Sequence, residues 1–143
     1  MKSKKIIGAA LVAALCLTPV TQSAAAAAEP YGIVSPLYEI AYDTYVELSI
    51  NGSTATCKSI ANSNSAVKIT AEQYLQKQGF LWIWSTYDGA EWTKTVNAPT
   101  ISMSNTKSGL TSGKYRLKTI FTLTDKNGKT ETITVYSNEK TVG

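Results

Sequence analysis

The stretch KYRLKTIFTLT (residues 114–124) decides the fold. Every second position carries a residue suited to a half-buried strand: Tyr115, Leu117, Thr119, Phe121 and Leu123. Such alternation places these side chains on one face of a β-strand, and β-branched and aromatic residues favour strands. The sequence therefore predicts a strand over 114–124 whose apolar face lies in a core.

Turn signals and further alternating segments lie on both sides of this strand. DKNGK (125–129) predicts a hairpin turn, after which 130–137 returns as the partner strand. Upstream, 45–50 alternates, and Asn51-Gly52 is the strongest short hairpin signal. The returning strand, 53–61, carries small residues on one face: Ala55, Cys57, Ser59 and Ala61.

The middle of the chain is less uniform. For 67–78 we favour a strand with a bulge near Gln73, and a short helix over 70–78 is the alternative because Thr70-x-x-Gln73 resembles a capping box. Further strands are predicted over 80–87, 92–96 and 100–104, with a turn at Asp88-Gly89. About seven short strands predict an all-β chain folded as an antiparallel β-sandwich.

The N-terminus predicts export. Three lysines in residues 1–5 precede an apolar run of 12 residues, Ile6 to Leu17, which is too short to anchor in a bilayer. Small residues follow at 23–28, so we expect a signal peptide over 1–28 with cleavage after Ala28, although Ala26 fits almost as well. The remainder, 29–143, is then a single secreted domain with no membrane span.

Charge and composition argue against several functions. The chain has 14 basic and 10 acidic residues and no histidine. Removal of 1–28 takes three lysines and leaves a net charge of +1, which predicts neither nucleic-acid binding nor attraction to an anionic membrane. The lack of histidine removes the commonest general base and metal ligand. Cys57 is then the lone cysteine, expected to be buried, with an intermolecular disulfide or a reactive thiol as alternatives.

Two groups of carboxylates are candidate sites. Asp88 and Glu91 flank Gly89-Ala90, and a glycosidase needs two carboxylates across a sugar, but a solvated turn explains the pair. Glu39, Asp43 and Glu47 supply too few oxygens for calcium. The sequence predicts no catalytic residue, no cofactor and no metal.

An aromatic group is the sharpest feature. Trp82, Trp84, Tyr87 and Trp92 fall within eleven positions and are the candidate binding residues. Such rings stack on sugars or anchor a protein surface. In the strand expected over 80–87, the tryptophans share one face, and Leu81 and Ile83 share the other. Only one face of a sandwich strand points inward, so the sequence leaves open whether Trp82 and Trp84 are core or surface.

Two resemblances add to these predictions. SGKYRLK (112–118) resembles the entry to strand F of immunoglobulin-like domains. This resemblance implies a tyrosine corner at Tyr115, an inward Leu117, and a core tryptophan at Trp82 or Trp84.

The chain also resembles, over about residues 33–137, a family of small uncharacterised secreted proteins of Gram-positive bacteria with an immunoglobulin-like β-sandwich. The shared patterns are 48–57 (LSINGSTATC), Leu75-Gln76-Lys77 followed by tryptophans, and 113–117 (GKYRL). The resemblance implies fold and secretion and adds no catalytic residue.

From these observations we expect a secreted, non-catalytic binding module that uses aromatic contacts with a carbohydrate or a protein surface. The alternative is a structural or self-associating cell-envelope protein that pairs through strand edges or Cys57. A small hydrolase is the least favoured reading.

Overall fold

The chain is built almost entirely from strands. The computed structural model describes residues 38–143, so the signal peptide expected over 1–28 lies outside the described residues. The elements, in order, are β1 (Ala41–Asn51), β2 (Thr54–Ser63), β3 (Ala66–Gln78), the single turn η4 (Phe80–Trp82), β4 (Trp84–Val96), β5 (Thr100–Lys107), β6 (Gly113–Asp125), β7 (Thr130–Tyr136) and β8 (Lys140–Val142).

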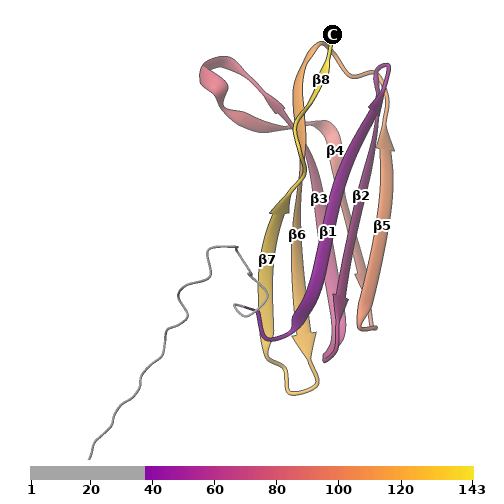
Figure 1. Cartoon of the computed structure of the whole chain (residues 1–143), viewed down its shortest axis with the longest axis vertical. Coiled ribbons are helices and arrows are strands. Elements are labelled where there is room, and N and C mark those ends of the chain that lie inside the picture. Colours follow the sequence, from indigo (N-terminus) through magenta and orange to yellow (C-terminus); the bar gives the residue numbers. More distant parts are fainter. Residues whose placement is uncertain (1–37) are drawn as a thin grey trace, which may run out of the picture. The chain divides into compact units, whose positions relative to one another are not determined.

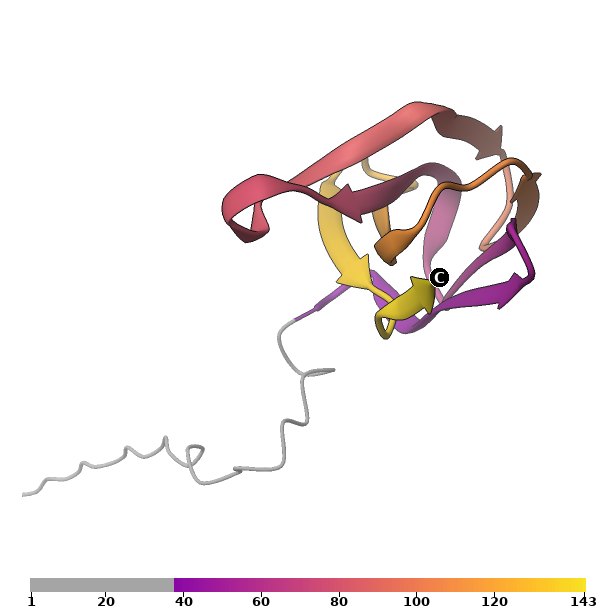
Figure 2. The ribbon, with the colours of Figure 1, turned by 90° about the horizontal axis from the view of Figure 1, so that it is seen from above.

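These strands form two antiparallel sheets that pack face to face (Figures 1 and 2). One sheet has the order β1-β2-β5. The other has the order β4-β3-β6-β7, and β8 pairs with the first three residues of β6. The predicted all-β sandwich is confirmed.

Alternation along the strands builds the core between the sheets. The predicted inward residues of β2 and β6 are all fully buried: Ala55, Cys57, Ser59 and Ala61 on β2, and Tyr115, Leu117, Thr119, Phe121 and Leu123 on β6. One core cluster centres on Ile69 and Phe121, and the other on Leu75 and Leu117.

Polar side chains inside the core satisfy one another. The Gln73 amide donates to the Ser59 hydroxyl (2.7 Å) and to the Cys57 carbonyl (3.2 Å), and Asn105 donates to the Gln73 side-chain oxygen (2.8 Å). The Ser59 and Thr119 hydroxyls lie 2.7 Å apart. A buried polar group costs little once it is hydrogen-bonded, so this network fixes the sheets against each other without leaving an open site.

One carboxylate joins the beginning of β1 to the opposite sheet. The Glu131 side chain on β7 accepts hydrogen bonds from the backbone N–H groups of residues 39, 40 and 41, at 2.8, 3.1 and 2.9 Å. Hydrogen bonds to an ionised acceptor are stronger than neutral ones. This contact closes the sandwich along the side formed by β1 and β7.

Three sequence-based expectations about the middle of the chain are corrected. Residues 66–78 form one strand, as favoured, so the alternative helix over 70–78 is wrong. The strand expected over 80–87 begins only at Trp84, because 80–83 form a tight turn. Asp88-Gly89 lies inside β4 and does not form a turn between strands.

The structure places the bulge of this region in β4. Tyr74 pairs with Glu91 and Gln76 pairs with Thr86, so residues 87–90 of β4 face the single residue Leu75 of β3. Gly89 takes φ +70°, which suits glycine, and Ala90 is fully buried. The turn-like sequence therefore bends a strand. The bulge expected in β3 near Gln73 is therefore wrong, because Gln73 pairs regularly with Trp92 and Thr119 and the extra residues belong to β4.

Candidate functional site

An apolar hairpin tip projects from the sandwich between β3 and β4 (Figures 1 and 2). Its four consecutive large side chains are mostly exposed: Phe80 84%, Leu81 63%, Trp82 74% and Ile83 61%. We call these four residues the apolar tip. Scattered exposed apolar residues are ordinary, but a contiguous group of large ones marks an interaction surface. The tip is therefore the strongest candidate site in the described part of the chain.

The backbone of the tip is strained. Leu81 and Trp82 have φ values of 59° and 60°, and the Ile83 N–H donates to the Phe80 carbonyl (3.3 Å). Positive φ at both central residues is the pattern of a type I′ hairpin turn, which strongly favours Asn-Gly. A bulky side chain in this region costs about 1–2 kcal/mol. Strain of this kind points to a function at the site where it is found.

The root of the hairpin carries an aromatic and cationic cluster. The Arg116 guanidinium lies 4.3 Å from the centre of the Trp84 ring and 4.3 Å from that of the Tyr136 ring. These two rings come from strands on the two sides of β6. The Arg116 Nε donates to the Gln76 side chain (2.8 Å), which fixes the guanidinium in place. We call Trp84, Arg116 and Tyr136 the root cluster.

Positive charge predominates around the hairpin root. The sequence has no Asp or Glu between Glu72 and Asp88, an interval that includes the whole tip. The Lys77 ammonium donates to the Thr111 hydroxyl (2.7 Å), and the Lys118 ammonium lies 5.8 Å from the centre of the Tyr74 ring. Among residues 38–143, the two ion pairs join Lys114 to Glu139 and Lys129 to Glu39. Lys77, Arg116 and Lys118 therefore form no ion pair in this part of the chain, although the carboxylates of Glu72 and Glu91 lie beside Tyr74, whose ring Lys118 faces.

No protein-family model matches the chain, and no curated protein matches it in sequence. Among solved structures, OgpA from Akkermansia muciniphila superposes with a TM-score of 0.39 at 18% identity, over 72% of this chain and 31% of that chain. CsgH from R. palustris superposes with a TM-score of 0.37 at 10% identity, over 66% of this chain and 87% of that chain.

These neighbours are distant. This chain spans about a third of the length of OgpA, and both TM-scores are low. Residues 38–143 contain no helix that is long and apolar enough to cross a membrane.

The four aromatic residues predicted as a binding group do not lie together: two belong to the projecting hairpin and two pack against the core. Trp82 lies at the exposed tip, and Trp84 lies at its root, partly covered by Arg116. Tyr87 packs edge-to-face on the buried Tyr115 ring, with centroids 5.5 Å apart. Trp92 is partly buried and packs against both core clusters. The implied core tryptophan at Trp82 or Trp84 is therefore wrong, because Trp92 takes that position.

Sequence reasoning missed most of the residues that surround Trp82. Phe80, Leu81 and Ile83 were placed in a strand because FLWIW (80–84) contains no turn residue. Nothing in the sequence pairs Arg116 with Trp84 and Tyr136. The available signal was the run of five apolar residues itself, since a strand in a two-layer sandwich can bury only one face.

Other candidate groups in the described residues do not form a site. Asp88 and Glu91 are exposed on β4, and residues 38–143 hold no group of three metal-ligating side chains. Burial raises the pKa of the Cys57 thiol to about 12, and the side chain is fully enclosed. A second folded copy cannot reach it, so a disulfide between folded copies is excluded.

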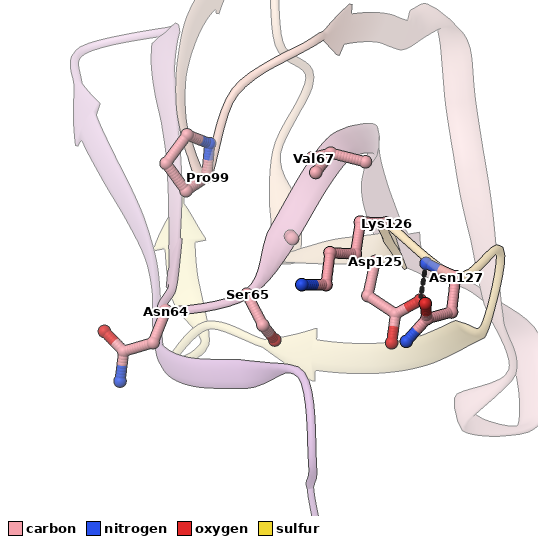
Figure 3. Close-up of a pocket in the computed structure, with 8 residues that line it drawn as sticks. Asn64, Ser65, Val67, Pro99, Asp125, Lys126 and Asn127 are labelled. Atoms are coloured by element: carbon pink, nitrogen blue, oxygen red, sulfur yellow. Dashed lines mark hydrogen bonds between the residues drawn. The ribbon is translucent and has the colours of Figure 1, made fainter.

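An open pocket of about 400 Å³ lies at the other end of β3 from the tip (Figure 3). It is lined by the loops that contain Asn64, Pro99 and Asp125. The Asp125 carboxylate accepts hydrogen bonds from the backbone N–H groups of Asn127 (2.9 Å) and Lys129 (3.0 Å). The carboxylate that lines this pocket is therefore already hydrogen-bonded to the backbone of the turn 125–129.

Proposed function

We propose that this chain is a secreted, non-catalytic binding module that engages its partner through the apolar tip of the β3–β4 hairpin. The observation that carries the proposal is the combination of four exposed apolar side chains with a strained turn that presents them. Exposure of large apolar side chains is unfavourable in water, and each one is worth about 1.5–3 kcal/mol when it is fully buried. Contact with a partner would bury them.

Secretion and an immunoglobulin-like classification belong to the same proposal. The signal-like sequence of residues 1–28 supports export. The Tyr115 hydroxyl donates to the Thr111 carbonyl (2.7 Å), which is the contact of a tyrosine corner, and Leu117 is fully buried. These contacts support an immunoglobulin-like sandwich as the scaffold that holds the hairpin.

The root cluster bears on the kind of contact the hairpin makes. A tryptophan that stacks on a sugar needs a free ring face, and Arg116 covers one face of the half-buried Trp84 ring. Trp82 has no such cover and is 74% exposed. Contact with the partner is therefore assigned to the tip, and the root cluster supports it.

The test is binding of a chain of residues 29–143 to isolated cell envelopes and to a glycan panel. The double variant Leu81→Asn/Trp82→Gly keeps a type I′ turn and removes two apolar side chains. We expect it to lose at least tenfold in affinity, whereas Tyr42→Ser, a change at a 68% exposed aromatic residue of β1, should bind like the parent chain. Equal binding by the tip variant would refute the proposal.

A further inference from the structure

The shape and chemistry of the apolar tip favour one class of partner. The tip is a projecting end of a hairpin and not a groove, and all four of its side chains are apolar. We infer that the apolar tip inserts into the interfacial region of a lipid bilayer that carries anionic headgroups. This inference rests on the proposed function, because it names the partner of the same tip.

Part of the backbone of the tip is hydrogen-bonded internally. The Gly79 N–H donates to the Ile83 carbonyl (2.7 Å), the Trp82 N–H to the Gly79 carbonyl (3.2 Å), and the Ile83 N–H to the Phe80 carbonyl (3.3 Å). In lipid, each unsatisfied backbone group costs several kcal/mol, so an inserted segment must bond its backbone internally. The turn makes three such bonds within five residues, and the N–H groups of Phe80 and Leu81 and the carbonyls of Leu81 and Trp82 have no backbone partner in the described residues. The internal bonds therefore reduce the cost of insertion and do not remove it.

The reach of the tip matches the depth of the interface. Gln78 and Trp84 form the last ladder pair of β3 and β4, and the tip extends two to three residues beyond them. At about 3.3 Å per residue this is roughly 7–10 Å. Interfacial protein segments bury their apolar side about 5–10 Å into the headgroup and acyl boundary. With the tip at that depth, Trp84 lies at headgroup level.

The root cluster supplies the groups expected at headgroup level. Tryptophan and tyrosine concentrate at membrane–water interfaces, and the root cluster contains one of each beside Arg116. Lys77 and Lys118 add two cations that form no ion pair in the described structure. Anionic phosphate groups complement these charges. The small net charge expected for the mature chain does not oppose this arrangement, because the cations are gathered near one end of one sheet.

The experiment is partitioning of residues 29–143 onto vesicles of phosphatidylcholine, with and without a fraction of phosphatidylglycerol, measured by co-sedimentation. Brominated acyl chains report depth, because they quench tryptophans that reach them. We expect binding to both kinds of vesicle, tighter with phosphatidylglycerol, and quenching that Trp82→Ser removes. Trp84 and Trp92 should be quenched little, since one lies at the root and the other is partly buried in the core.

Two matched sets of variants separate the contributions of the tip and of the charges. Trp82→Ser should lower partitioning at least tenfold on both vesicles, and Tyr42→Ser, at the opposite end of the sandwich, should leave it unchanged. The pair Lys77→Gln and Arg116→Gln should lower it about fivefold per charge on phosphatidylglycerol vesicles, with little effect on phosphatidylcholine. Urea unfolding of each variant establishes that it is folded.

The outcomes distinguish this inference from the proposed function. Tip-dependent binding to envelopes with no partitioning onto vesicles would overturn the lipid inference and leave the binding module standing, with a protein or glycan as partner. Equal partitioning by the parent chain and Trp82→Ser would overturn the inference. A dimer in sedimentation equilibrium without lipid that Trp82→Ser abolishes would also overturn it, because a second copy would then cover the tip. Envelope binding that is equal in the parent chain and in the tip variants would overturn both the proposed function and the lipid inference.

Discussion

Replacing Leu81-Trp82 by Asn-Gly should make the protein more stable, even though it removes the two side chains at the centre of the candidate site. Both residues have positive φ, and a bulky residue in that region costs about 1–2 kcal/mol. Asn and Gly adopt it readily. The glycine lowers this gain by about 0.4–1 kcal/mol, because it increases the conformational entropy of the unfolded chain.

The net expectation is a gain of about 1–3 kcal/mol in the free energy of unfolding. Little packing is lost, since the two side chains are 63% and 74% exposed. For a domain of this size the gain corresponds to a rise in Tm on the order of 10 °C. Urea unfolding of residues 29–143, followed by the fluorescence of the partly buried Trp92, measures the gain. The slope of the free energy of unfolding against urea concentration should be the same in the variant and the parent chain.

The control changes the neighbouring tip residue whose backbone is not strained. Ile83 is 61% exposed and has φ −79°, so Ile83→Ser should alter stability by less than about 0.5 kcal/mol. A double variant that is equal to or weaker than the parent chain would refute the assignment of strain to the turn. A stabilised variant that has lost its binding would mean that the tip keeps its residues at a cost to stability.

Three further outcomes are expected. Burial raises the pKa of Cys57 above its ordinary 9.0 to about 12, so the unfolded chain loses the thiol proton first and the free energy of unfolding falls as pH rises between these values. Between about pH 8 and pH 10 the free energy of unfolding should fall about 1 kcal/mol less in Cys57→Ala than in the parent chain, and an identical fall in urea unfolding would contradict this. Tyr115→Phe leaves the Thr111 carbonyl without its donor and should cost about 1–3 kcal/mol in urea unfolding, whereas no loss would show that water replaces the hydroxyl. Glu131→Ala should cost about 1.5–3 kcal/mol and speed amide exchange at residues 39–41 but not in β6; unchanged exchange would mean that the carboxylate does not hold the beginning of β1.

Most of the sandwich could be predicted because period-two alternation reports which face of a strand is buried. The inward residues of β2 and β6 follow from that pattern alone, and Asn51-Gly52 marks its hairpin correctly. The prediction failed where local signals and tertiary structure disagree. Asp88-Gly89 has the composition of a turn, but the burial of Ala90 and the packing of Tyr87 on the core keep it inside β4.

The candidate site was predicted only in part, for a related reason. Trp82 was chosen for its chemistry, and it does lie at an exposed surface. The turn that presents it contains none of the residues that favour a turn, so a strand was the natural interpretation of 80–87. Arg116 and Tyr136 join Trp84 through strand order, and the order of strands in a sheet cannot be read from one sequence.

The hydrogen bonds that Glu131 accepts from the beginning of β1 also bear on when the two sheets can close. They join residues up to 92 positions apart, so the beginning of β1 cannot be tied to the second sheet until β7 has been synthesised, although β1 can already pair with β2. Folds dominated by such distant pairings form slowly, in milliseconds to seconds. A chain that is still being synthesised can therefore hold paired hairpins, but its two sheets close along β1 and β7 only near the end of synthesis.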